Sequence, residues 1–197
     1  MPRPPSDIRH RVLTAARSRF LAEGVDGASL RAIARDANTS IGMVYYYFPT
    51  KDELFHGVVE DVYAVLLEDL ENILTEHPTF EARVRALYLR LARGTEVEAD
   101  TVRLIVREAV TSSGRFTRLR ERFKRGHIAL ALRLVNEGRH EGAVASEVPM
   151  PLTAIAIGAL GLMPQAILRA FGHASPEGST AMVDSLVRVL LGGVGAR

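Results

Sequence analysis

Apolar residues recur at the spacing of a helix along almost the whole chain. In the first stretch they fall four apart, at Ile8, Val12, Ala16 and Phe20, and no segment shows the period of two that a half-buried strand requires. Capping residues, glycines and prolines separate these runs. The pattern predicts an all-α protein of about nine helices, over residues 6–24, 30–37, 41–48, 50–77, 80–93, 100–112, 115–141, 151–171 and 179–191.

Residues 29–48 predict a helix-turn-helix. Ser29 can cap the first, short helix. The turn after it, residues 38–40, starts with an asparagine, which tolerates a positive φ, and ends on Ser40, which can cap the next helix. That second helix is short enough to lie in a DNA major groove, with Val44 and Phe48 on its inner face. The alternative is an ordinary corner between two helices, with tyrosines filling a groove.

The outer face of this second helix is expected to carry aromatic and small residues. Three consecutive tyrosines, Tyr45, Tyr46 and Tyr47, cannot share one buried stripe, so at least one faces outward, where a phenol can reach a phosphate oxygen or a base edge. Gly42 lowers helix stability by about 1 kcal/mol relative to alanine, and a close approach to a DNA backbone is one reason for a glycine there. The outer face consists of Ile41, Gly42, Met43, Tyr45 and Tyr46.

Charge is distributed unevenly along the sequence. The 197 residues carry 25 Lys and Arg against 23 Asp and Glu, a net charge of +2. Residues 1–51 hold eight of the basic and four of the acidic residues, so the N-terminal quarter is positive and the remainder slightly negative. This asymmetry favours a polyanionic partner for the N-terminal part.

Composition excludes several other classes of function. The chain has no cysteine, which removes disulfides, thiolate metal sites and cysteine nucleophiles. The longest apolar run, Leu152–Met163, is shorter than the roughly 20 residues that a membrane span needs, so we expect a buried core helix, no membrane association and a cytoplasmic protein.

The segment from Ser29 to Leu54, above all its last part YYYFPTKDEL, closely resembles the tetracycline-repressor-like (TetR) family of bacterial transcription regulators. The resemblance covers about residues 7–60 in sequence and the whole chain in length and helix number. It implies a three-helix DNA-binding domain over residues 1–50 and a helical ligand-binding and dimerisation domain over residues 51–197. The implied function is that of a ligand-responsive homodimeric repressor, which binds a palindromic operator in double-stranded DNA and releases it when a small molecule binds the C-terminal bundle.

The resemblance also assigns DNA contacts. Tyr45 falls on a family position that touches bases or backbone, and Tyr46 and Tyr47 fall on phosphate-contacting positions. Lys51 falls on the family lysine that holds a phosphate at the start of the fourth helix, where the helix N-terminus also favours an anion. The full set of expected DNA contacts is Ser29, Arg31, Thr39, Ser40, Ile41, Gly42, Met43, Tyr45, Tyr46, Tyr47 and Lys51.

Two departures from the family pattern bear on base reading. Asn38 stands where the family usually has glycine, and the turn is expected to survive because asparagine accepts the same backbone region. Residues 38–50 carry no charge. Base reading is therefore expected to rest on apolar contacts and tyrosine hydroxyls.

The C-terminal bundle is expected to hold a ligand pocket and a dimer interface. Residues 153–163 are apolar on every side and must be covered all round. Together with the last helix, and with the same two helices of a second protomer, they are predicted to form a four-helix interface. Its residues are Ile155, Ala159, Leu162, Val183, Leu186, Val187 and Leu190. The alternative is that both helices complete the core of one chain. Helical position alone suggests a pocket made of Tyr63, Leu66, Tyr88, Leu104, Glu108, Phe123, His127 and Met163, although such residues are also typical of plain core.

Nothing in the sequence predicts catalysis. The histidines are scattered, and although His56 and Glu60 have the i, i+4 spacing of a metal pair, helices often show that spacing by chance. No HExxH, phosphate-cradling or nucleophile motif occurs. We therefore expect no catalytic residue, no metal site and no cofactor apart from an unidentified small-molecule effector. An enzyme and a helical scaffold remain the alternative functions.

Overall fold

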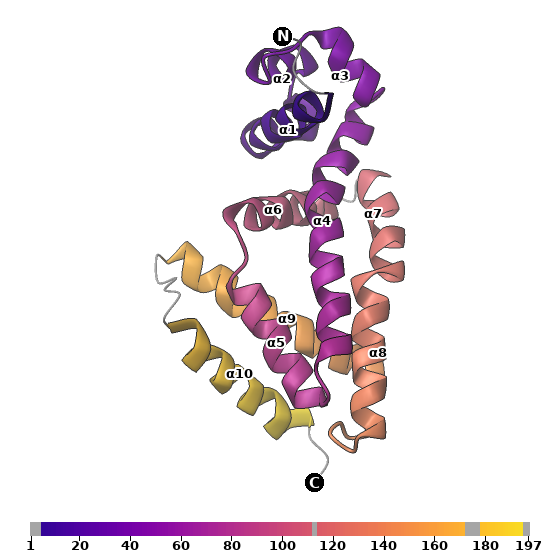
Figure 1. Cartoon of the computed structure of the whole chain (residues 1–197), viewed down its shortest axis with the longest axis vertical. Helices are drawn as coiled ribbons and strands as arrows, with labels where there is room; N and C mark the ends of the chain where they lie inside the picture. Colours follow the sequence, from indigo (N-terminus) through magenta and orange to yellow (C-terminus); the bar gives the residue numbers. More distant parts are fainter. Residues whose placement is uncertain (1–4, 112–113, 172–177, 195–197) are drawn as a thin grey trace. The chain divides into compact units, whose positions relative to one another are not determined.

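The computed structural model of the chain describes residues 5–111, 114–171 and 178–194 (Figure 1). These residues form helices and connecting turns without a strand, which confirms the predicted all-α class. The helices are α1 (Pro5–Gly27), α2 (Leu30–Asp36), α3 (Ile41–Tyr47), α4 (Lys51–Glu76), α5 (Phe80–Ala92), α6 (Glu96–Val110), α7 (Gly114–Arg125), α8 (His127–His140), α9 (Met150–Ala170) and α10 (Gly178–Val194).

Two helices differ from their expected extents. The expected helix over 115–141 is broken into α7 and α8 at Gly126, whose backbone (φ −101°, ψ −118°) is not helical. α6 begins at Glu96, about four residues before the predicted start, with two glutamates in its first turn. Acidic residues at a helix N-terminus offset the helix dipole.

The described chain divides into two compact units. The first comprises residues 1–65 and 96–121, and the second comprises residues 66–95 and 122–197. α6 and the first part of α7 thus belong with the three N-terminal helices, although the sequence suggested a division after residue 50. The predicted division into a DNA-binding domain (residues 1–50) and a ligand-binding and dimerisation domain (residues 51–197) is a functional one, and it stays a prediction.

The core of the first unit lies where α1 packs against α2, α3 and α6. The predicted stripe of α1 is confirmed from Val12 onward, because Val12, Ala16 and Phe20 are fully buried. The Phe20 ring lies 6.2 Å from that of Phe55, on α4. These contacts form a hydrophobic base for the helix-turn-helix.

α4 approaches α3 very closely at Gly57. A Cβ atom placed there would lie 2.6 Å from Cε1 of Phe48, the residue that ends α3, and 3.2 Å from Cδ2 of Leu13. Only a residue without a side chain leaves room for this contact. The C-terminal end of α3 is therefore packed tightly against the first turns of α4.

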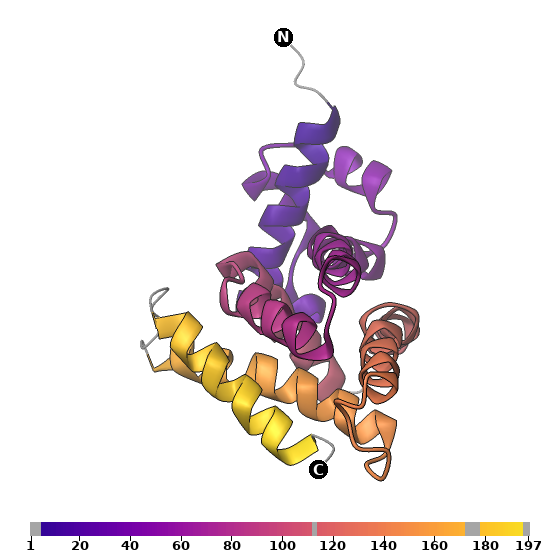
Figure 2. The same ribbon diagram turned by 60° about the horizontal axis from the view of Figure 1, so that its bottom comes forward.

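In the second unit α5 packs against α8, α9 and α10, and α9 also packs against α8 and α10 (Figures 1 and 2). At Gly138 of α8 an added Cβ would lie 2.5 Å from the ring of Phe80 on α5, so this pair of helices is also closely packed. The buried core residues of the unit are Leu74, Phe80, Val84, Tyr88, Leu134, Val135, Val144, Ile157, Val183, Val187 and Leu190.

α9 is covered on one face only. Its buried residues are Thr153, Ile157, Gly161 and Gln165, spaced four apart. The opposite face exposes Leu152, Ile155, Leu162, Met163 and Ile167, each by 47% or more of its surface. The expectation of a fully buried core helix is therefore wrong for this face within one chain. By length and composition alone Met150–Leu168 could also cross a membrane, a test that core helices of soluble proteins pass as well.

Candidate nucleic-acid interface

The turn of the helix-turn-helix is fixed by caps and by one arginine. Ser40 Oγ accepts a hydrogen bond from the backbone N–H of Met43 at 3.2 Å, and Ser29 caps α2 in the same way. Asn38 adopts a φ of +49°, which confirms the predicted left-handed position. Arg11 of α1 donates from Nη1 to the carbonyl oxygens of Ala37 at 2.8 Å and Asn38 at 3.1 Å. The orientation of α3 relative to α1 and α2 is thereby restricted.

Outward-facing tyrosines distinguish α3. Val44 and Phe48 are buried, as predicted, while Tyr45 is 51% exposed and Tyr46 is 76% exposed. The ring of Tyr46 meets that of Tyr47 edge-on at 5.1 Å, which limits its motion. A short helix thus presents two exposed phenols, which can contact a phosphate or a base edge.

Gly42 lies on the exposed surface of α3. A Cβ atom placed there would meet only Ser40 Oγ, at 3.8 Å, so nothing within the described chain requires a glycine at this position. Its neighbours Ile41 and Met43 are half-buried, as is Thr39 in the turn. Because Gly42 has no side chain and its two neighbours are half-buried, the backbone of α3 is accessible at this point.

The two expected cations lie on the helices before and after α3, Arg31 on α2 and Lys51 at the start of α4. Lys51 donates from Nζ to the carbonyl oxygen of Asp26 at 2.8 Å, and this bond ties its ammonium group to the C-terminal end of α1. Arg31 is exposed on α2 and forms no hydrogen bond or ion pair within the described part of the chain. A surface hollow there is lined by Ala28, Ser29, Leu30, Arg31, Ile41, Tyr45 and Lys51.

Two other cations of the N-terminal helices, Arg19 and Arg9, are already paired. Arg19 bonds to Asp36 and Glu23, each at 2.6 Å, and these carboxylates raise its pKa. Arg9 lies 3.5 Å from Asp61 and above the ring of Phe48. Arg31, by contrast, has no counter-charge within the described residues, and Lys51 is hydrogen-bonded to a carbonyl oxygen.

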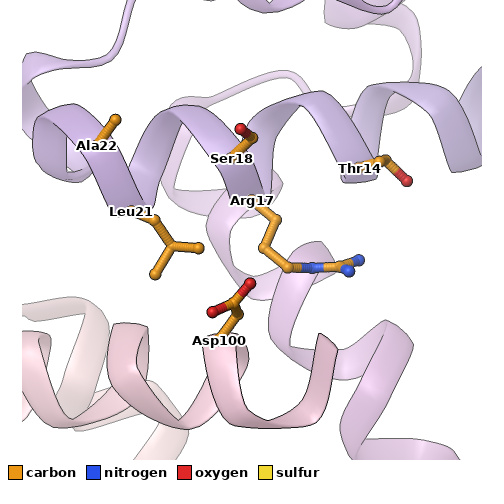
Figure 3. Close-up of a pocket in the computed structure, with 6 residues that line it drawn as sticks. All are labelled: Thr14, Arg17, Ser18, Leu21, Ala22 and Asp100. Carbon is orange, nitrogen blue, oxygen red and sulfur yellow. The ribbon is translucent and has the colours of Figure 1, made fainter. Parts of the chain in front are cut away.

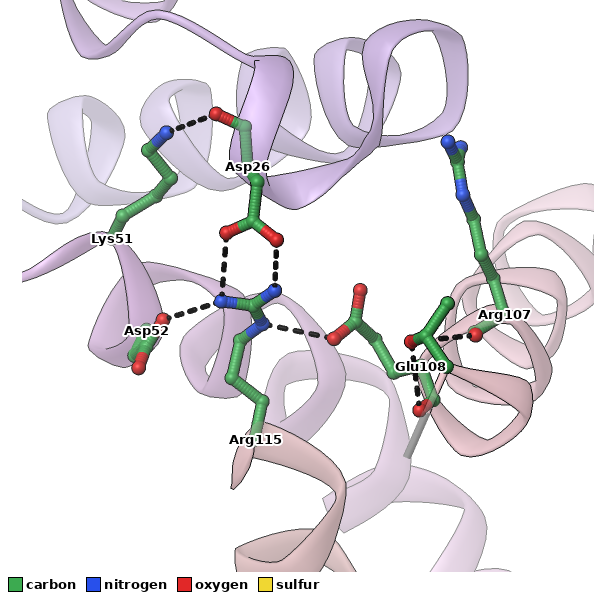
Figure 4. Close-up of polar contacts among 7 residues, drawn as sticks. Asp26, Lys51, Asp52, Arg107, Glu108 and Arg115 are labelled. Atoms are coloured by element: carbon green, nitrogen blue, oxygen red, sulfur yellow. Dashed lines mark hydrogen bonds and ion pairs between the residues drawn. The ribbon is translucent and has the colours of Figure 1, made fainter. Parts of the chain in front are cut away.

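A network around Arg115 joins α7 to three other helices of the same unit (Figure 4). Its guanidinium contacts both carboxylate oxygens of Asp26 at 3.0 and 2.8 Å, Asp52 at 3.0 Å and Glu108 at 2.9 Å. The hydrogen bonds from Arg115 lower the pKa of Asp26. The carbonyl of the same Asp26 receives the bond from Lys51, so one residue connects the network to the expected phosphate-binding lysine.

Comparison with known proteins gives the same picture as this geometry. Residues 12–58 match the model of the tetR family of bacterial regulatory proteins. An HTH-type transcriptional regulator of Haemophilus influenzae is 26% identical over 83 residues, or 42% of this chain and 44% of that protein. The HTH-type transcriptional repressor SCO4008 of Streptomyces coelicolor is 25% identical over 149 residues, or 76% of this chain and 73% of the repressor.

The segment that contains the helix-turn-helix is thus similar to the tetR family of bacterial regulatory proteins. DNA-binding transcriptional regulation is the function class of this family, and the relatives named above are regulators or repressors rather than enzymes. A solved structure with the same fold is the transcriptional regulator FadR of Bacillus subtilis in complex with stearoyl-CoA, with a TM-score of 0.77 and 17% identity over 94% of this chain and 98% of that one. This chain spans less than half the length of the matched regulator of Haemophilus influenzae.

The residues predicted to line the ligand pocket are divided between the two units. In the first unit Tyr63 and Leu104 are buried, and Glu108 is bound by Arg115 rather than left free for a ligand. In the second unit Tyr88 is fully buried, and the half-buried rings of Phe123 and His127 lie 5.0 Å apart.

Two further pocket candidates lie nearer the surface of the second unit. Leu66 is half-buried on α4. Met163 is 56% exposed, on the outer face of α9, so it belongs with the exposed apolar surface. A ligand pocket formed by the whole predicted set stays a prediction.

The predicted dimer residues are sorted by their burial. Ile155, Ala159 and Leu162 lie on the exposed face of α9, and Leu186 is half-buried. Val183, Val187 and Leu190 of α10 are at most 3% exposed because they complete the core against α5. The structure thus moves these three from a partner interface to the interior of the chain, whereas Val189 of the same helix is 63% exposed.

Arg11 and Arg115 were missed by the sequence analysis. Arg11 lies 26 residues from the carbonyl that it holds, and Arg115 lies 89 residues from Asp26. The only sequence signal for either is an arginine near a helix end, which is common in so arginine-rich a chain. Neither partner could have been identified from spacing.

Proposed function

We propose that this protein is a tetR-family repressor that binds a palindromic operator as a homodimer and releases it when a small molecule binds the second unit. The observation that carries the proposal is the set of outward groups on the helix-turn-helix, namely Tyr45, Tyr46, Arg31 and Lys51. SCO4008, which matches most of this chain, is itself named a repressor.

Each DNA contact has its own role in this proposal. Lys51 and Arg31 bind phosphates and supply the salt-dependent, sequence-independent part of the affinity. Tyr45 and the exposed α3 surface around Gly42 approach base edges. Because residues 38–50 are uncharged, discrimination between bases arises from apolar contacts, such as those to thymine methyl groups, and from hydroxyl groups.

The exposed face of α9 supports dimerisation. Leu152, Ile155, Leu162 and Ile167 form a continuous apolar stripe, and a soluble chain rarely leaves so large an apolar surface exposed unless a partner covers it. A two-fold dimer would bring two recognition helices to half-sites about 34 Å apart, one turn of B-DNA.

Two buried polar groups in the second unit indicate the chemistry of the effector. The hydroxyl of Tyr88 and the side-chain amide nitrogen of Gln165 are buried without a hydrogen-bond partner, and burial raises the pKa of Tyr88, which keeps its hydroxyl a donor. A mostly apolar molecule with at least one hydrogen-bond acceptor would satisfy these groups. Reciprocity then requires that the operator weaken effector binding by the same factor, typically about 5–150-fold.

The test is fluorescence anisotropy of the purified protein with DNA from its own upstream intergenic region and with scrambled DNA, over a salt series. We expect tight binding to the first DNA only. Lys51→Met is expected to lower the slope of log affinity against log salt by about 1, the value for one lost phosphate contact. Tyr45→Ala is expected to lower affinity for the specific DNA more than for scrambled DNA.

The matched control is Lys124→Met, which alters the only other lysine, an exposed residue of α7. Its binding curve is expected to equal that of the wild type. If Tyr45→Ala and Lys51→Met bind as the wild type does, with unchanged melting, the helix-turn-helix is not a DNA interface. A scaffold or enzyme function would then replace this proposal.

A further inference from the structure

A pocket unrelated to the DNA-facing surface lies between α1 and α6, both in the first unit (Figure 3). Figure 3 shows Arg17 and Leu21 reaching from α1 toward α6, and the carboxylate of Asp100 rising from α6 toward them. The residues that line the pocket are Thr14, Arg17, Ser18, Leu21, Ala22 and Asp100.

Arg17 is the unusual member of this group. Only 7% of its surface is exposed, and its Nε is buried without a hydrogen-bond partner. The structure gives its guanidinium no ion pair or hydrogen bond with any described residue. A buried N–H donor without an acceptor is unfavourable, because it has lost its hydration and gained no hydrogen bond in exchange. The pocket beside it is where a compensating anion can enter.

The other lining groups restrict which anion fits. Asp100 is held through Oδ1 by Nη1 of Arg103 at 2.7 Å, so its charge is partly offset while its second oxygen can still accept a hydrogen bond. The hydroxyls of Thr14 and Ser18 lie one helical turn apart on α1. Leu21 and Ala22 add an apolar wall.

We propose that this pocket binds a small carboxylate that also carries a hydroxyl or amino group. The carboxylate pairs with the guanidinium of Arg17, and the hydroxyl or ammonium group donates to the free oxygen of Asp100. A planar guanidinium with two parallel N–H groups matches a carboxylate better than a lone oxygen atom. A bare anion satisfies Arg17 but leaves Asp100 without a donor.

Such a ligand would act on the DNA-binding part of the chain. α1 packs against α2, α3 and α6, so a molecule seated between α1 and α6 contacts the helix that supports the recognition helix. The pocket is therefore a second effector site, distinct from the one proposed for the second unit. Binding here requires neither DNA nor the other effector.

The test measures binding of L-lactate, L-serine, propionate and inorganic phosphate to the full-length protein by isothermal titration calorimetry. We expect lactate or serine to bind at least tenfold more tightly than propionate and phosphate. Arg17→Met is expected to abolish binding, and Asp100→Asn to reduce the preference for lactate or serine over propionate. The control, Arg93→Met, changes an exposed arginine of the second unit and is expected to bind as the wild type does. Equal binding of all four anions, equal loss in Arg17→Met and Arg93→Met, or no binding at all overturns the proposal.

A second measurement covers the case in which Arg17→Met fails to bind because it is damaged. If Arg17 has no partner in the free protein, Arg17→Met is expected to melt at the same temperature as the wild type or higher, because methionine fills the space without a charge. If instead Arg17→Met and Asp100→Asn each lower the melting temperature, and the double variant lowers it no further, the two residues form a structural ion pair. That result overturns the proposal, and no operator is needed to obtain it.

Discussion

At the scale of single residues, Gly42 is a position where helix stability and DNA binding favour different residues. Glycine lowers the stability of a helix, and the space around Gly42 is open enough to accept a larger residue. No contact within the described chain accounts for it. We interpret it as the point where the recognition helix comes nearest to the DNA.

Gly42→Ala is therefore expected to have opposite effects on folding and on DNA binding. The free energy of unfolding should stay the same or rise by up to about 1 kcal/mol, the difference in helix propensity between the two residues. Affinity for the operator should fall on the order of tenfold, or about 1.4 kcal/mol, because the added methyl group meets the DNA surface. Denaturant unfolding and fluorescence anisotropy measure the two quantities.

Gly114→Ala is the control for this change, because Gly114 also has open space around it and lies on a different helix, α7. It is expected to leave operator affinity unchanged. Equal affinity of Gly42→Ala and wild type would place position 42 outside the interface.

At the scale of elements, one arginine connects the helices of the first unit. Glu108 is the buried member of the Arg115 network, with 6% of its side chain exposed, whereas Asp26 and Asp52 are 85% and 56% exposed. Exposed ion pairs contribute little to stability. The pair of Arg115 and Glu108 is thus the part of the network on which folding depends.

Arg115→Met is expected to destabilise the protein by about 3–5 kcal/mol, because it leaves the buried carboxylate of Glu108 without its cation. The double variant Arg115→Met with Glu108→Leu removes both charges and should recover most of that loss. Asp52→Asn, which alters an exposed partner, should change the unfolding free energy by less than about 1 kcal/mol. Urea unfolding of the variants gives all three values, and a double variant no more stable than Arg115→Met would contradict the assignment.

The helices themselves were largely predictable, because their signals are local. Ser29 and Ser40 cap the helices that they were expected to cap, and Asn38 takes the backbone position that its side chain tolerates. The break at Gly126 was not predicted, because the apolar spacing continues on both sides of it and a single glycine does not by itself end a helix. The networks of Arg11 and Arg115 join segments that are distant in sequence, so the spacing of residues along the chain does not predict them.

At the scale of the whole molecule, the apolar helices show what periodicity leaves open. It identified both α9 and α10 as apolar but could not tell which surface the chain itself would cover. Val183, Val187 and Leu190 are covered by α5 and its neighbours, while the stripe through Ile155 and Leu162 stays exposed. The proposed interface is therefore narrower on α10 than the sequence suggested.

Ile155→Glu combined with Leu162→Glu is expected to convert the proposed dimer to a monomer, because two buried carboxylates in an apolar interface would be left unpaired. Each chain should remain folded, since both positions are exposed within it. Analytical ultracentrifugation measures the mass, and operator affinity should fall with it because half-sites are then bound singly. Val106→Glu, at an exposed valine of α6, is the control that should remain dimeric. A variant that sediments as the wild type would exclude this face of α9 from the interface.

The contact of Gly57 with Phe48 has a mechanical consequence. The backbone of α4 touches the aromatic ring that ends α3 with no space for a methyl group between them, so the two helices cannot slide or tilt past each other at this point. α3 and the first turns of α4 then form one rigid lever arm, although Pro49 and Thr50 separate them in sequence. A rotation of α4 at its start would therefore rotate the recognition helix with it.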